Sequence, residues 1–245
     1  MAVRLYAVLR LRPRTRKSLP PGLHGERLRV VESAGCSLAV ADTVGPLEPT
    51  VDDLLQFDLV IRSLHDLSNA ILPARFDAVA PSVSAVSSEI AGRADELNAA
   101  LDNVTDCVQM TVRLPAGPAR AVRPSRSGKG GRGKGAAYLQ TRAHRFRPPA
   151  LKQLRRAVAD LVHDELVEPG PAGVGVYHLI DRTDAGAYLS RLGDISAAGP
   201  FPPYAFVPGI DHAIWPGHDN EKSQPADARS SRPRTHRRSA RNAHR

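Results

Sequence analysis

The residues best placed to do chemistry form one run of glycines and basic side chains, Gly128-Lys-Gly-Gly-Arg-Gly-Lys134-Gly135, which fits the GxxxxGK pattern of phosphate-binding loops. Such a loop needs Ser or Thr after the lysine, because that hydroxyl coordinates magnesium, and Gly135 stands there instead. No buried strand leads into the run. We therefore interpret residues 119–135 as a flexible basic connection and predict no nucleotide site there.

Other catalytic signatures are missing from the sequence. There is no GxSxG, HExxH or Rossmann glycine pattern, and the histidines are scattered. Cys36 and Cys107 are the only cysteines, and neither belongs to a CxxC pair. Two isolated cysteines are typical of small buried thiols in a reducing compartment. We predict no catalytic residue, no cofactor and no structural metal, and thus a protein that is not an enzyme.

The positive charge is concentrated in two segments. Residues 119–135 carry +6 and residues 218–245 carry +5, so the rest of a chain with a net charge of +9 is close to neutral, at −2. Clusters of Lys and Arg attract phosphates without regard to sequence. Neither segment interleaves aromatic residues for base stacking, so we expect at most weak, non-specific binding to nucleic acid. A basic nucleic-acid-associated protein acting through these segments remains the alternative function.

Hydrophobic periodicity predicts the elements that must position any site. Residues 3–11 alternate as a strand, with Arg4 and Tyr6 on the face opposite the apolar one. Apolar residues at helical spacing predict a helix over 51–68, with a stripe that includes Leu54, and another over 81–101. Further strands are expected at 28–32, 37–41 and 106–114.

The second half of the chain follows the same pattern. A helix is expected over 136–145, and a second from Pro149 to Pro169-Gly170. A strand at 174–180, a helix at 183–192 and an extended segment at 201–207 complete the order. This succession predicts an α+β fold with helices on one face of largely antiparallel sheets.

Changes in composition along the sequence predict four parts of the chain. They are an N-terminal α+β domain (1–115), a flexible basic Gly-rich loop (116–134), a C-terminal α+β domain (135–209) and a disordered basic tail (210–245). No apolar run approaches the roughly 20 residues that span a bilayer. The first residues are too charged for a signal peptide. We therefore predict a cytoplasmic protein with no membrane partner.

Two apolar segments stand out. Ile71-Leu72-Pro73-Ala74-Arg75-Phe76 is an apolar turn with one arginine between two predicted helices. Gly199-Pro200-Phe201-Pro202-Pro203-Tyr204-Ala205-Phe206-Val207 presents three aromatic residues on a backbone that proline restricts. The second segment has two interpretations, a proline-led edge strand that closes a core or a surface for a partner.

These two segments, with Leu5–Val8 and Gly135–Leu139, resemble in order the motifs of the gas vesicle accessory protein family GvpL/GvpF. The resemblance covers residues 3–207 and leaves out the tail. Asp77 stands where the family has glycine, and Phe201 where it has tryptophan.

The resemblance implies a non-enzymatic role in gas vesicle assembly and two ferredoxin-like α/β-sandwich halves. It implies binding to the hydrophobic shell protein and to other gas vesicle proteins, and hence association with the gas vesicle. Within it we expect six partner-binding residues: Pro73, Arg75, Phe76, Pro203, Tyr204 and Phe206. Arg75 has a second interpretation, as a buried structural arginine paired with a carboxylate.

Overall fold

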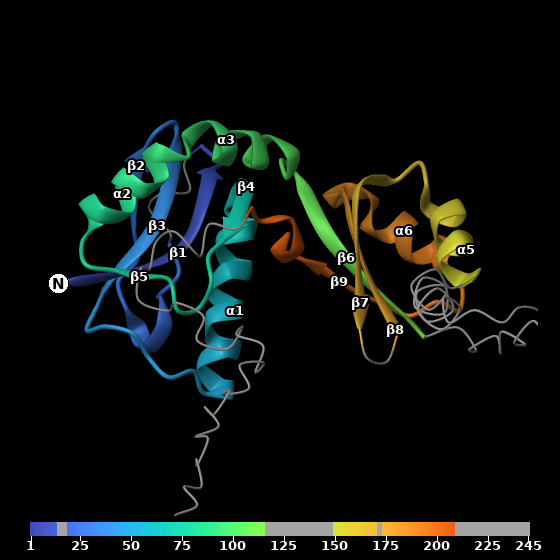
Figure 1. Cartoon of the computed structure of the whole chain (residues 1–245), viewed down its shortest axis with the longest axis horizontal. Helices are drawn as coiled ribbons and strands as arrows, with labels where there is room; N and C mark the ends of the chain where they lie inside the picture. The colour runs from blue at the N-terminus through green and yellow to red at the C-terminus, as the bar shows by residue number, and fades with distance from the viewer. Residues whose placement is uncertain (14–18, 116–148, 171–172, 209–245) are drawn as a thin grey trace, which may run out of the picture. The chain divides into compact units, whose positions relative to one another are not determined.

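The structure is a computed structural model that describes residues 1–13, 19–115, 149–170 and 173–208 (Figure 1). Within them it contains five α-helices and nine strands arranged in two antiparallel sheets, which confirms the predicted α+β class. All of these residues belong to one compact unit, Met1–Trp215. The basic loop, the helix expected at 136–145 and the tail lie outside the described residues, and the predicted domain boundaries remain predictions.

The first sheet is built around the N-terminal strand. It comprises β1 (Ala2–Leu11), β2 (Arg29–Ser33), β3 (Cys36–Thr43), β4 (Ser68–Pro73) and the short β5 (Val79–Ala80). The strand order is β2-β3-β1-β4, and β5 also pairs with β1. Three strands therefore hydrogen-bond to β1, which makes it the centre of this half of the fold.

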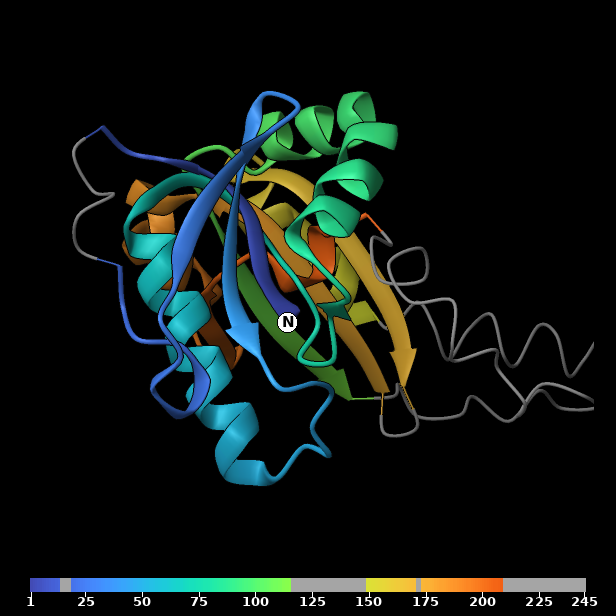
Figure 2. The ribbon, with the colours of Figure 1, turned by 90° about the vertical axis from the view of Figure 1, so that its left-hand side faces the viewer.

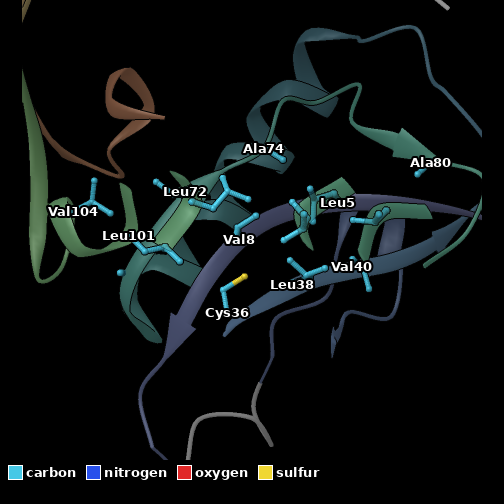
Figure 3. Packing of buried hydrophobic residues seen from close by; sticks show 14 of the residues in the cluster. Leu5, Val8, Cys36, Leu38, Val40, Leu72, Ala74, Ala80, Leu101 and Val104 are labelled. Carbon is cyan, nitrogen blue, oxygen red and sulfur yellow. The ribbon is translucent and has the colours of Figure 1, made fainter. Parts of the chain in front are cut away.

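Helices cover both faces of this sheet, whereas the sequence predicted that helices would cover only one face (Figure 2). One face packs on α1 (Val51–Asp66), and the other on α2 (Val83–Gly92) and α3 (Ala94–Asn103). Figure 3 shows the second of these cores, where residues of β1 and β3 meet Leu101 of α3. The predicted single helix over 81–101 is interrupted at Arg93, which has non-helical dihedral angles.

The second sheet has two described helices, which pack on the same face. It contains β6 (Cys107–Pro115), β7 (Val162–Gly170), β8 (Gly173–Asp181) and β9 (Ala197–Phe201), in the order β7-β8-β6-β9. α5 (Pro149–Val158) and α6 (Ala185–Leu192) pack on this sheet. The predicted alternation of β6 is confirmed, because Val108, Met110, Val112 and Leu114 pack beneath these helices and Cys107 packs in a different core.

Three short 3-10 helices complete the described elements. They are η2 (Leu23–Gly25), η3 (Arg182–Asp184) and η4 (Tyr204–Phe206). The expected extended segment at 201–207 is thus only partly extended, since β9 ends at Phe201 and a 3-10 turn follows.

Two local predictions were wrong. The first half of the apolar turn predicted at 71–76 belongs instead to strand β4 (Ser68–Pro73), with Ile71 buried in one core and Leu72 in the other, and the chain turns only after it. In a short strand that is buried on both faces, apolar and polar residues do not alternate, so the sequence pattern does not identify it as a strand. The helix starting at Pro149 ends at Val158, and 162–170 is an edge strand rich in charged residues. Charged residues on an edge strand oppose pairing with other chains. In the sequence, the same residues look like the polar side of an amphipathic helix, which is why the helix was predicted to continue.

Gly199 generates the first testable prediction. Its φ is +133°, and a Cβ placed there would lie 2.8 Å from the Gln109 carbonyl oxygen and 2.9 Å from the Met110 sulfur. We expect Gly199→Ala to lower the free energy of unfolding by about 2–4 kcal/mol, through backbone strain and overpacking. Urea denaturation followed by circular dichroism measures this loss.

Gly186 provides the matched control, because it lies in α6 and a Cβ there would meet nothing within 4 Å. Gly186→Ala should leave stability unchanged or raise it by up to about 1 kcal/mol. Equal stabilities of the two variants would contradict the proposed strain at Gly199.

Candidate functional site

The six predicted partner-binding residues lie in two places, at the end of β4 with its following turn and on η4. Their exposure differs: Arg75 and Tyr204 are exposed, Phe76 and Phe206 are partly buried, and Pro73 and Pro203 are buried. Both segments contact α1. Phe76 packs on Phe57 of that helix, and the Tyr204 hydroxyl donates a hydrogen bond to Asp58. The structure therefore brings both segments to one helix.

Phe76 is held in place by its neighbours. Its ring lies edge-on to Phe57, with centroids 5.6 Å apart, and the Arg4 guanidinium lies 5.4 Å from its centroid. The Nη1 of Arg4 also donates to the Phe76 carbonyl oxygen at 2.8 Å. Aromatic and cation–π contacts of this kind fix a ring in a defined orientation. In this structure Phe76 therefore positions the turn that carries Arg75.

Arg4 and Tyr6 form a buried polar cluster that the sequence analysis missed. Both were expected on the polar face of a strand, yet both are fully buried because α1 and the other helices cover the sheet on its two sides. The Nε of Arg4 lies 3.5 Å from Glu26. The Tyr6 hydroxyl donates to Glu26 at 2.6 Å and accepts from the Leu23 N–H at 2.7 Å, and burial raises the pKa of this tyrosine. A buried charge requires such partners.

Arg75 lies on the surface, and its described ion pair is local. Its side chain is 54% exposed, and its Nε lies 3.2 Å from Asp77, two residues along the chain. Of its two interpretations, the buried structural arginine is therefore wrong, and Arg4 fills that role instead. Partner contact by Arg75 stays a prediction.

The second motif segment, residues 199–207, is called the closing segment below, and several contacts hold it in place. The Tyr204 hydroxyl donates to Asp58 at 2.5 Å, and desolvation together with this carboxylate raises the pKa of the phenol. The Arg62 guanidinium lies 4.9 Å from the centroid of the Phe201 ring. The Ala205 N–H donates to the side-chain oxygen of Gln109 at 2.7 Å, and Gln109 itself is buried. The segment thus joins β6 to α1 while Tyr204 stays 38% exposed.

Among the residues that the structure describes, one buried network in the second sheet resembles catalytic machinery. His178 places Nδ1 2.7 Å from the Tyr188 hydroxyl and Nε2 3.0 Å from Glu165, and Glu165 also pairs with Arg155. His178 is 1% exposed and Tyr188 is fully buried, so a substrate has no access to them. Burial lowers the pKa of His178 and raises that of Tyr188. This network fastens β7 to β8 and α6.

Metal-binding and redox chemistry find no support in the described residues. Within these ranges no three His, Cys, Asp or Glu side chains gather as a metal site. Cys36 and Cys107 are free and buried, and burial raises the pKa of the Cys107 thiol to about 11. Such a thiol stays protonated at neutral pH and is a weak nucleophile. No helix in the described part of the chain combines the length and the apolar character needed to cross a bilayer.

His65 connects α1 to the second sheet and makes stability depend on pH. Its Nε2 donates to the Cys107 carbonyl oxygen at 3.1 Å, and burial, aided by the charge of Arg182, lowers its pKa to about 4. The unfolded chain takes up this proton below about pH 6.5 and the folded protein only below about pH 4. Acidification through this window therefore favours unfolding.

We expect the wild type to lose up to about 1.4 kcal/mol of stability per pH unit from this group as pH falls from 6.5 to 4. His65→Gln can still donate to the Cys107 carbonyl but does not titrate, so its stability should fall less over the same range. Chemical denaturation at several pH values measures both slopes. Parallel slopes would show that His65 does not contribute.

Comparisons with known proteins agree on one family. The sequence model described as "Gas vesicle synthesis protein GvpL/GvpF" matches residues 2–208. No curated protein sequence matches the chain. The crystal structure of GvpF from Microcystis aeruginosa is similar with a TM-score of 0.68 and 12% identity, covering 84% of this chain and 98% of that one. GvpF from Anabaena sp. PCC7120 is similar with a TM-score of 0.62 and 12% identity, covering 84% and 96%.

The two structural likenesses confirm the fold, and the family model spans both motif segments. The chain therefore belongs to the GvpL/GvpF family of gas vesicle synthesis proteins.

Proposed function

We propose that this protein is an assembly factor for gas vesicles, which acts by binding the hydrophobic shell protein and other gas vesicle proteins rather than by catalysing a reaction. The observation that carries the proposal is the family match over residues 2–208. The proposal places the protein inside the cell, with the gas vesicle. It requires no cofactor.

The shell protein itself gives the physical reason why such a factor is needed. A hydrophobic subunit that builds a protein shell exposes apolar surface and strand edges before it assembles, and such surfaces aggregate. A folded partner prevents this by covering an edge or by holding a helix against an apolar surface. The exposed side chains of Arg75 and Tyr204 support contact with such a partner, because the surrounding contacts fix their positions.

The basic segments at 119–135 and 218–245 support a second candidate, non-specific binding of nucleic acid through phosphate contacts. Deletion of 218–245 should then abolish a salt-dependent shift of DNA or RNA in a native gel. If the full chain produces no such shift at low salt, this candidate is excluded.

Co-purification tests the assembly proposal directly. The full chain and a variant ending at residue 210 are expressed with the shell protein and the other proteins of a gas vesicle set, and each is recovered by an affinity tag. We expect both forms to retain gas vesicle proteins, because the family match ends at residue 208. A well-folded full chain that retains none of them, at any salt concentration, would refute the proposal.

Arg75 gives a sharper version of this test. We expect Arg75→Ala to abolish recovery of the partner and to change the free energy of unfolding by less than about 0.5 kcal/mol, because the arginine is exposed and its ion pair is local. Arg191→Ala is the matched control, since Arg191 is also a partly exposed arginine in an ion pair, with Asp160. A collapse in stability of the Arg75 variant would assign this residue a structural role.

A further inference from the structure

The exposed apolar side chains of the described residues are concentrated on α1. Nine large hydrophobic residues are exposed in total, and four of them lie on this helix. Val51, Leu55 and Leu59 are 73%, 60% and 63% exposed, and their spacing of four residues puts them on one stripe along two turns. Leu54, which the sequence analysis assigned to the core, is 46% exposed beside them.

The stripe is not needed to hold the helix in the fold. The opposite side of α1 already buries four large apolar residues against the first sheet: Phe57, Val60, Ile61 and Leu64. A helix in a globular protein normally presents polar residues on its other side. Contiguous exposed apolar surface of this kind marks a place where another molecule binds.

Aromatic residues of the closing segment extend this stripe. Asp58 and Arg62 follow Val51 by seven and eleven residues, so they lie on the same side of the helix. Asp58 accepts the hydrogen bond of the Tyr204 hydroxyl, and Arg62 lies over the Phe201 ring. The stripe together with these two aromatic residues is called the α1 surface below.

Charge decides what can cover the α1 surface. Residues 48–66 contain five acidic residues and one arginine, a net charge of −4 within a chain of net charge +9. Asp53 is largely buried beside His24, and Asp66 lies 3.8 Å from Arg182, so the acidic excess along the helix is smaller than this count but keeps its sign. A second copy would bring its own acidic residues against these, which opposes self-association. Nucleic acid is repelled for the same reason. A partner that carries Lys or Arg beside its apolar residues complements both features.

We infer that the α1 surface binds an amphipathic helix of another gas vesicle protein, with apolar residues at three- and four-residue spacing and basic residues on both sides of them. Val51 and Leu59 are about 12 Å apart along the helix axis, which matches two turns of a partner helix packed alongside. Tyr204 and Phe201 supply aromatic contacts at one end. This inference rests on the proposed function and gives it a binding surface.

The test uses the full chain and a pair of designed helical peptides of about 20 residues. Both peptides carry the same leucine stripe, and lysines flank it in one and glutamates in the other. Fluorescence anisotropy measures binding at low and high salt. We expect the lysine peptide to bind, more weakly at high salt, and the glutamate peptide to bind at least about tenfold more weakly.

Two double variants locate the binding. Leu55→Gln with Leu59→Gln removes apolar area from the stripe without changing the charge. We expect this double variant to bind the lysine peptide at least about tenfold more weakly than the wild type does. Leu166→Gln with Leu189→Gln is the matched control, since these leucines are 37% and 44% exposed on β7 and α6, and binding should be unchanged. Circular dichroism checks that both variants stay folded.

Several results would overturn the inference. They are no binding of the lysine peptide, equal binding of the two peptides, and equal binding by wild type and the stripe variant. Sedimentation that shows a wild-type dimer, dissociated by the stripe variant, would identify a second copy as the occupant instead.

Recovery of gas vesicle proteins from cells separates this inference from the proposed function. If the stripe variant recovers them as well as the wild type does, the α1 surface is not the docking site and the assembly role stands. If the wild type itself recovers none, the assembly role fails, and the peptide measurements alone decide what the α1 surface binds.

Discussion

Burial of β1 on both faces is the constraint on which the first half of this protein depends. The strand pairs with three others, and helices close over each side of the sheet, so no position along its middle reaches water. A polar side chain in that position costs free energy unless its hydrogen bonds are satisfied inside. Tyr6 meets this requirement, because its hydroxyl donates to Glu26 and accepts from the Leu23 N–H. Arg4 meets it only in part: it donates to the Phe76 carbonyl oxygen and lies 3.5 Å from Glu26, while its Nε and Nη2 are buried without a hydrogen-bond partner among the described residues.

The same cluster connects the core to the candidate site. Phe76 is placed between Arg4 and Phe57, so the orientation of the turn after β4 follows from interactions formed beneath it. Arg75 then projects from this fixed turn with more than half of its side chain exposed. A rigid support lowers the entropy that is lost when a surface residue engages a partner.

Helix α1 contacts both halves of the described chain. One side packs in the first sheet, and His65 near its end donates to the backbone of β6. Asp58 and Arg62 hold the aromatic residues that follow β9. Because one helix meets both motif segments, a partner bound along it would contact residues that are more than 100 positions apart in the sequence.

The sequence by itself determined the α+β class, the strands at 3–11, 106–114 and 174–180, and the four ordered segments that resemble the family to which the chain belongs. These follow from local periodicity and from residue types that occur together. It could not reveal the strand at 68–73 or the one at 162–170, because a buried apolar run and a charged edge lack the alternation of a half-buried strand.

Only the tertiary structure decided which arginine is buried and which side of α1 stays exposed. Arg4 and Arg75 are both arginines beside apolar residues. They differ because helices cover β1 on both faces, whereas no described helix covers the turn that carries Arg75. Leu54, Leu55 and Leu59 look like core residues in the sequence, yet the sheet contacts the other side of the helix. Burial depends on what packs against a residue from distant parts of the chain, and a local pattern does not contain that information.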